Sequence, residues 1–152
     1  MTYTLTNTAI DVNLKHRQLT LLKRELTKQQ FTPVKNYPIA VGFYDGPGGE
    51  PDYPTPEGIY GVMKKAKNPD WLMPHSPWVA EELQGTLIEG GDPRNPIVAR
   101  WIQISDYGVG IHGTLADDSI GQAASHGCIR MHVDDVIELY DRVPKGTVVH
   151  VG

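Results

Sequence analysis

The one cysteine of the chain, Cys128, ends the run Ser125-His126-Gly127-Cys128, and a second histidine, His112, precedes this run by a short polar stretch. A thiol attacks a carbonyl as the thiolate, and a neighbouring imidazole can accept its proton, so cysteine–histidine pairs recur in acyl transfer. Gly127 has no side chain, which lets the backbone approach a reacting carbonyl. These residue types at this spacing predict nucleophilic catalysis.

Other interpretations of the same residues stay open at this level. A free cysteine taken alone is more often a buried structural thiol than a nucleophile, although its histidine and glycine neighbours favour reaction. If the segment is extended, His126 and Cys128 project to the same face, so proximity alone would nominate His126 as the base. Zinc binding by His112, His126, Cys128 and His132 is the weaker alternative, because the separation of His126 and Cys128 by one residue is narrower than common zinc spacings.

The motif resembles the signature of the L,D-transpeptidase catalytic domain, also called the YkuD domain. That signature is a histidine, a spacer, then Ser or Thr, His, Gly, Cys and an apolar residue, which here are His112 and the run from Ser125 to Ile129. Residues 37–42 and 55–58 resemble the first strands of the family, so the resemblance runs from about residue 8 to the C-terminus. It implies one domain over residues 1–152 with a mainly β, sandwich-like fold and one or two short helices.

The resemblance also implies roles for the site residues. Cys128 would be the nucleophile and His112 its base, with the second ring nitrogen of His112 oriented by the backbone carbonyl of Gly113. Such a pair would carry an imidazolium–thiolate population, reactive toward alkylating reagents at mildly acidic pH. His126 would support the site, and backbone N–H groups around Gly127 and Cys128 would stabilise the oxyanion.

Two further neighbours of the nucleophile belong to the predicted substrate-binding site. Arg130 stands where many members of the family carry Asn, and it is equally well interpreted as a solvated cation or as a clamp for a carboxylate of the donor peptide. Ser125 is expected to hold the loop through its hydroxyl, since nothing nearby would activate it as a nucleophile. The remaining histidines are expected to be surface or core residues; they are His16, His75, His132 and His150.

The reaction that the resemblance implies is acyl exchange on peptidoglycan. Cys128 would attack the carbonyl of the third residue of a stem tetrapeptide, D-Ala would leave, and an amine of a neighbouring stem would complete a cross-link. Water as the acceptor would make the same site an L,D-carboxypeptidase or peptidoglycan peptidase. A non-catalytic cell-wall binding domain is a further alternative, which the intact His112 and Cys128 pair disfavours. Carbapenems are expected inhibitors, and no metal or organic cofactor is needed.

Composition restricts the class of protein. A chain of 152 residues with 39% apolar and 21% charged residues is typical of a globular domain that can bury a core, and no apolar run approaches the roughly 20 residues of a membrane helix. A net charge of −4 with scattered lysines and arginines argues against nucleic acid. The family implies the cell envelope, but the N-terminus has no basic region followed by an apolar block, so a cytoplasmic location or a shortened chain stays open.

Most of the elements predicted to position the site are strands. Alternating or β-rich residues predict strands at 8–13, 18–23, 39–43, 59–63, 97–104 and 147–151. One helix is predicted from the apolar stripe Val133, Val136, Ile137 and Tyr140, and Pro144 and Gly146 should end it.

Two loops are expected beside the site. Residues 45–51 are rich in glycine and proline, and by family analogy they form a loop near the site entrance. Residues 68–96 are long and punctuated by prolines, which predicts a lid that covers substrate with Trp71 and Trp78, with a packed surface flap as the alternative.

Overall fold

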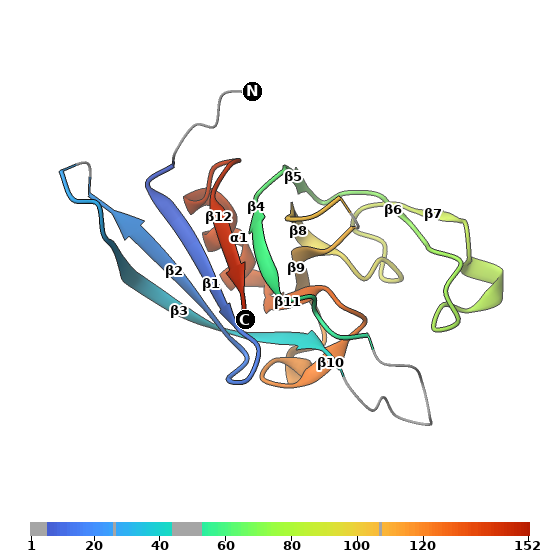
Figure 1. The fold of residues 1–152 in the computed structure, drawn as a ribbon. Helices are drawn as coiled ribbons and strands as arrows, with labels where there is room; N and C mark the ends of the chain where they lie inside the picture. The colour runs from blue at the N-terminus through green and yellow to red at the C-terminus, as the bar shows by residue number, and fades with distance from the viewer. Residues whose placement is uncertain (1–5, 26, 44–52, 107) are drawn as a thin grey trace.

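The computed structural model describes residues 6–25, 27–43, 53–106 and 108–152, and much of this chain is extended (Figure 1). The strands are β1 (Thr8–Asn13), β2 (Gln18–Arg24), β3 (Phe31–Gly42), β4 (Gly58–Gly61), β5 (Lys64–Lys67), β6 (Trp71–Leu72), β7 (Leu87–Ile88), β8 (Val98–Gln103), β9 (Gly110–Thr114), β10 (Ala123–Ser125), β11 (Ile129–His132) and β12 (Val148–Val151). Within the described ranges, the helices are α1 (Val133–Arg142) and two short 3-10 turns, η2 (Glu81–Leu83) and η3 (Asp117–Ser119). The mainly β fold class is confirmed.

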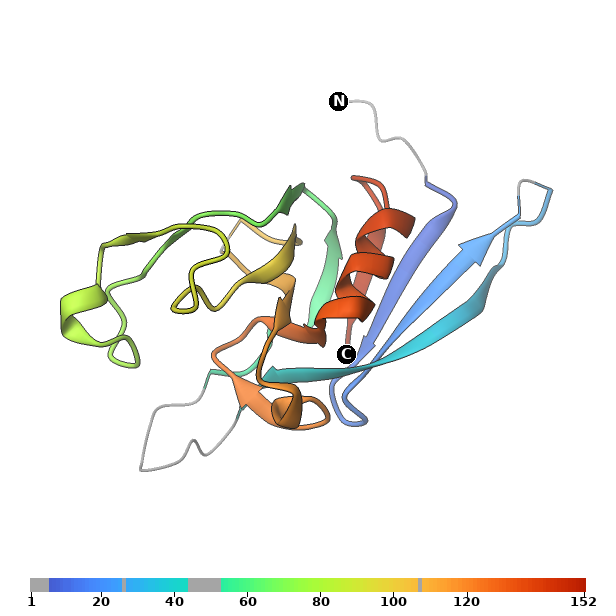
Figure 2. The same ribbon diagram turned by 180° about the vertical axis from the view of Figure 1, so that it is seen from behind.

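One long, curled sheet makes most of the fold, with the strand order β4-β12-β1-β2-β3-β11-β9-β8-β5. The long strand β3 belongs to both halves of this sheet, because its first part pairs with β2 and its last residues pair with β11 and β10. Figure 2 shows α1 between the β1–β3 strands on one side and the β8 and β9 strands on the other. The curling therefore produces the sandwich-like arrangement that the sequence predicted.

The core fills the space between the two halves of the sheet and α1. Its fully buried side chains include Ile10, Val12, Leu19, Ile39, Ile102, Ile111, Ile129, Met131, Val136 and Leu139. From the predicted stripe the helix buries Val136 and packs Ile137 and Tyr140 against the core, and it also buries Leu139, which the stripe did not include. Asp134 and Asp135 occupy the first turn, where the helix dipole favours negative charge. The stripe is therefore core packing.

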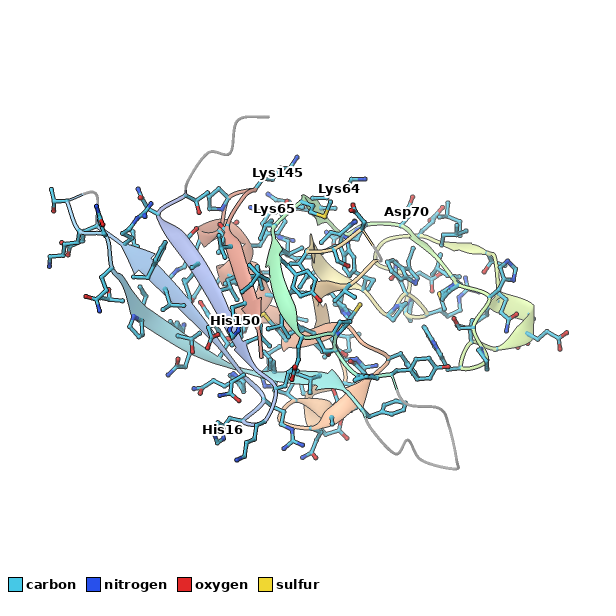
Figure 3. The ribbon with its side chains drawn as sticks, in the orientation of Figure 1. His16, Lys64, Lys65, Asp70, Lys145 and His150 are labelled. Atoms are coloured by element: carbon cyan, nitrogen blue, oxygen red, sulfur yellow. The ribbon has the colours of Figure 1, made fainter. Side chains whose placement is uncertain are left out.

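Strand boundaries follow the predictions where apolar residues alternate. The strands predicted at 8–13, 18–23, 59–63, 97–104 and 147–151 are β1, β2, β4, β8 and β12, with ends that differ by no more than two residues. The strand predicted at 39–43 is the end of β3, which begins at Phe31; Pro33 and Pro38 obscured its first part, since proline is disfavoured in strand interiors. The edge strand β5 was not predicted, because Lys64, Lys65 and Lys67 give no apolar alternation (Figure 3). Charge is tolerated at an edge, where it discourages pairing with other chains.

Residues 68–96, which we call the flap, form an ordered unit that extends away from the sheet (Figure 1). Strands β6 and β7 pair with each other, and Met73, Val79 and Ile88 make a small separate core. At the base of the flap, the buried Asn95 amide donates to the carbonyl oxygens of Pro69 (3.0 Å), Ile88 (3.3 Å) and Glu89 (3.2 Å). These bonds join the two ends of the flap.

Two expectations concern parts of the chain away from the core. The loop expected at 45–51 lies outside the described residues. Within the described residues, no helix has both the length and the apolar character needed to cross a bilayer.

Candidate active site

Two neighbouring parallel strands bring the predicted nucleophile and base together. The register of β11 and β9 sets Ile129 opposite Ile111 and Arg130 opposite His112. Because both isoleucines are fully buried in the core, the alternate residues point to the other face of the sheet. Cys128, which directly precedes β11, lies on that face with His112 and Arg130, and the three side chains line a cavity of about 360 Å³.

The walls of this cavity come from four further parts of the chain, namely the flap with the adjoining Ile97, the segment at Tyr53, the segment at Gly108, and the turn before Cys128. The flap contributes Trp71, Pro74, Ser76, Trp78 and Pro96; the other lining residues are Tyr53, Ile97, Gly108, Ser125 and His126. The structure thus brings Cys128, His112, His126, Arg130, Ser125, Trp71 and Trp78, all selected from the sequence, to one cavity. The lining residues that were not selected are Tyr53, Pro74, Ser76, Pro96, Ile97 and Gly108.

His112 is buried and held in a defined tautomer. Its Nδ1 lies 2.8 Å from the backbone carbonyl oxygen of Gly113, as the resemblance implied. A carbonyl only accepts, so Nδ1 carries the proton and the neutral ring keeps the lone pair on Nε2. Burial lowers the pKa of His112 from 6.5 to about 4; the Gly113 hydrogen bond opposes this shift, and the Arg130 cation adds a smaller lowering.

Gly113 is also required by packing. A Cβ at this position would lie 2.4 Å from the carbonyl oxygen of Val98 and 3.0 Å from Cγ1 of Val136. Glycine therefore lets β9 pass close to both β8 and α1, and this close passage fixes the carbonyl that orients His112.

Cys128 is a neutral thiol in this environment. Burial raises its pKa, against smaller lowering effects from the Gly110 backbone hydrogen bond and the Arg130 cation. Its Sγ lies 3.7 Å from the carbonyl oxygen of Gly108, to which the thiol donates. With the pKa of His112 lowered, both members of the pair are uncharged at neutral pH. The imidazolium–thiolate population expected from the sequence is therefore wrong for this arrangement, because desolvation disfavours both ions.

The turn before the nucleophile is held by Ser125. This serine is buried, its hydroxyl donates to the carbonyl oxygen of Cys128, and it accepts from the Gly127 N–H at 3.3 Å. Gly127 has φ of +117°, a conformation that side chains disfavour, which explains glycine in the motif. The expected loop-holding hydroxyl of Ser125 is present, and the Gly127 N–H, one of the expected oxyanion donors, already has this long hydrogen bond.

Aromatic rings surround His126. Its imidazole stacks on Trp78 with centroids 4.2 Å apart and an interplanar angle of 8°. Edge contacts come from Phe43 at 5.3 Å and Tyr53 at 5.2 Å. Three separate segments, the end of β3, the stretch before β4 and the flap, thus meet at this histidine.

Trp101 is a residue of the site region that sequence analysis missed. It lies opposite His112 in the pairing of β8 with β9, and the two rings are 6.1 Å apart. Trp71 of the flap packs edge-on against Trp101 at 5.5 Å. A Cβ on Gly110 would lie 2.5 Å from the Trp101 ring, so this glycine makes room for the indole.

Arg130 places a cation in the wall of the cavity. It is partly buried and lines the cavity, and burial lowers its pKa while the nearby Cys128 raises it. A partly desolvated guanidinium interacts with an anion more strongly than a fully hydrated one. The fully solvated cation considered from the sequence therefore does not describe this residue.

The other histidines lie outside the cavity. His132 pairs with Asp117 at 2.8 Å and His150 with Asp11 at 2.6 Å, both at the surface. Figure 3 shows His16 at the β1–β2 turn and His150 on β12, on the side of the molecule away from the flap. No group of three potential ligands that could hold a metal occurs among the described residues, so zinc binding gains no support there.

Comparison with known proteins gives the same family as the motif. Residues 7–151 match the family model of the L,D-transpeptidase catalytic domain, YkuD. YqjB of Bacillus subtilis, named as a candidate L,D-transpeptidase, is 41% identical over 113 residues, which are 71% of this chain and 57% of that protein. YkuD of Bacillus licheniformis, named in the same way, is 36% identical over 142 residues, 93% of this chain and 64% of that protein. The chain spans about three fifths of the length of these relatives.

Solved structures share the fold. L,D-transpeptidase 3 from Mycobacterium tuberculosis matches with a TM-score of 0.68 and 20% identity over 96% of this chain and 61% of that chain. A mutant L,D-transpeptidase from Enterococcus faecium matches with a TM-score of 0.67 and 24% identity over 97% of this chain and 50% of that chain. With the sequence match over nearly the whole length, the chain belongs to the L,D-transpeptidase catalytic domain (YkuD) family.

Proposed function

We propose that this chain is a single catalytic domain that cross-links peptidoglycan stem peptides through an acyl-enzyme on Cys128. One observation carries the proposal: Cys128 and His112 line the same cavity, and the bond from Nδ1 of His112 to the Gly113 carbonyl leaves Nε2 as an acceptor. A neutral imidazole beside a neutral thiol is suited to general-base catalysis, in which the proton moves as the attack proceeds.

The proposed reaction has two acyl-transfer steps. Sγ of Cys128 bonds to the carbonyl carbon of the third residue of a stem tetrapeptide while its proton passes to Nε2 of His112. The carbon–nitrogen bond to D-Ala then breaks, the departing amine takes that proton, and a thioester remains. An acceptor amine from a neighbouring stem attacks the thioester, gives a proton to His112, and the thiol is regenerated. Thiol, imidazole and oxyanion donors suffice, without a metal or organic cofactor.

Substrate recognition would use the charged and aromatic parts of the cavity. Arg130 is a lining cation that can form a bidentate pair with a carboxylate of the donor stem. Trp71 and Trp78 place the flap over the stem, so removal of the flap should impair cross-linking more than reaction with a small thiol reagent. Such a substrate places the reaction in the cell envelope.

Two other functions are compatible with the same residues. Water as the acceptor would give an L,D-carboxypeptidase or peptidoglycan peptidase, and a domain without chemistry would only bind the wall. The buried and oriented His112 favours an enzyme over a binding domain, because a binding site has no need of a desolvated base.

Intact-mass analysis with purified stem tetrapeptide, with and without a second stem as acceptor, tests the proposal. We expect a thioester adduct on Cys128, loss of D-Ala, and a dimer when the acceptor is present; release of tripeptide alone would identify the carboxypeptidase. Cys128→Ala should abolish both products while keeping the thermal midpoint, since loss of a partly buried thiol changes packing little. Product formation by this variant would refute the mechanism.

Inhibition by carbapenems follows from the same thiol. A solved structure that matches this fold is the L,D-transpeptidase LdtMt1 in complex with imipenem. We propose that imipenem also reacts with Cys128 of this chain, and we expect a covalent adduct that increases the mass of the chain by the mass of imipenem. An adduct on Ser125, or none after long exposure, would contradict the assignment of the nucleophile.

A further inference from the structure

The flap contacts the nucleophile turn through one of its tryptophans. Trp78 stacks on His126, which stands two residues before Cys128. At 4.2 Å and 8° the rings are nearly parallel and in van der Waals contact. Such contact leaves no space for a substrate group between them, so Trp78 has a protein partner in addition to its place in the cavity wall.

Trp78 is itself anchored inside the flap. It packs against the separate core of Met73, Val79 and Ile88, and the Asn95 amide joins the base of the flap. The position of this indole therefore depends on the flap as a unit. Because His126 stacks on the indole, the position of the His126 ring depends on the flap as well.

His126 in turn can transmit its position to the reacting groups. Phe43 and Tyr53 contact the ring at 5.3 and 5.2 Å, and loss of Trp78 would remove the stacked contact from this group of aromatic neighbours. The turn that follows is short and is held by two Ser125 hydrogen bonds. Because the turn is this short, a shift of the His126 backbone would displace the N–H groups of residues 127 and 128 relative to the thiol.

We propose that Trp78 is a positioning residue that holds His126 and the nucleophile turn in the geometry needed for acylation. The inference rests on the proposed function. It assigns Trp78 an effect on the rate of acylation, whereas a residue that only forms the wall would affect the affinity for the stem peptide.

The test separates acylation from peptide binding. Acetylation of Cys128 by p-nitrophenyl acetate, followed by intact mass, reports the reactivity of the thiol with an acyl group too small to need the flap. We expect Trp78→Ala to slow this acetylation and to lower kcat for stem tetrapeptide by about 2- to 10-fold, the range that aromatic stacking supports. Trp78→Phe should restore most of the rate. Leu72→Ala, an exposed position on the same flap, is the matched control and should match wild type.

A double-variant comparison tests the route through His126. If Trp78 acts through this ring, Trp78→Ala combined with His126→Ala should be no slower than His126→Ala alone. Additive losses, or a Trp78→Ala variant with normal acetylation and only a raised KM, would overturn the proposal.

Failure of the positioning role and failure of the proposed function give different results. Stacking should shift the ring protons of His126 upfield in the NMR spectrum of the wild type, and Trp78→Ala should remove that shift. The stem-peptide function alone is refuted if the wild type shows the NMR shift and is acetylated faster than Trp78→Ala, but releases no D-Ala from tetrapeptide. The positioning role alone is refuted if the wild type exchanges D-Ala but the wild type and Trp78→Ala are acetylated at the same rate.

Discussion

Replacing His112 with Asn should reduce the acid sensitivity of the fold. The folded pKa of His112 is about 4 and its ordinary value is 6.5. Between these values the unfolded chain binds a proton at this residue and the folded chain does not, so the free energy of unfolding falls as the pH falls through this window. A pKa difference of about 2.5 corresponds to about 3 kcal/mol lost between about pH 6.5 and about pH 4. Above the window the residue is neutral in both states and adds no pH dependence.

The measurement is urea unfolding followed by tryptophan fluorescence from about pH 7 to about pH 4. His112→Asn removes the titrating ring, and its side-chain amide can still donate to the Gly113 carbonyl. Across the window, the free energy of unfolding of the wild type should fall by about 3 kcal/mol more than that of this variant. The other titrating groups are shared by both proteins, so their contributions cancel in this difference. His16→Asn is the control, because His16 is exposed, and it should follow the wild type. Parallel curves for wild type and His112→Asn would refute the argument that burial keeps this histidine neutral.

Three further results are expected. The rate of acylation of Cys128 should fall on the acidic side with an apparent pKa near that of the buried His112, about 4, and a midpoint near 6.5 in a pH–rate profile would contradict the assignment of the base. Gly113→Ala should lower the free energy of unfolding by about 1–3 kcal/mol in urea titrations, because its Cβ would lie 2.4 Å from the Val98 carbonyl oxygen, whereas Gly61→Ala meets its nearest such atom at 3.9 Å and should change little. Asn95→Ala should speed cleavage of the flap in limited proteolysis, since three carbonyl hydrogen bonds at its base are lost, and unchanged cleavage would show that the flap core suffices alone.

The nucleophile turn could be predicted from sequence because its chemistry is local. Ser125, Gly127 and Cys128 are adjacent, and the positive φ of Gly127 and the hydroxyl of Ser125 act within a few residues. The strands β1, β2 and β12 could also be predicted from sequence, since more buried and more exposed side chains alternate along them. Local patterns thus identified both the motif and much of the sheet.

Residues contributed by long-range pairing could not be found in this way. Trp101 reaches His112 only because β8 pairs with β9 in one particular register. The space that Trp101 needs comes from Gly110, whose role is invisible without the neighbouring strand. A tryptophan in a predicted strand next to a glycine-rich strand was the available signal, and it does not specify the pairing.

The ionisation of the pair was mispredicted for a related reason. The sequence places a thiol near an imidazole, a combination that forms an ion pair only where the surroundings stabilise both charges, and burial is a property of the assembled fold. Desolvation raises the pKa of Cys128 and lowers that of His112, so the two effects together oppose an ion pair in the resting site.

This neutral resting state has a consequence for the proposed reaction. In the resting site the pKa of His112 is about 4, so burial favours loss of a proton from its imidazolium more than is usual for a histidine. The departing amine of the tetrahedral intermediate must gain a proton before the carbon–nitrogen bond breaks, and a strong acid beside it delivers that proton readily. Arg130 acts in the same direction, because its charge disfavours the imidazolium and favours negative charge near Cys128. Burial thus lowers the basicity of His112 in the attack and raises its acidity in the expulsion of the amine.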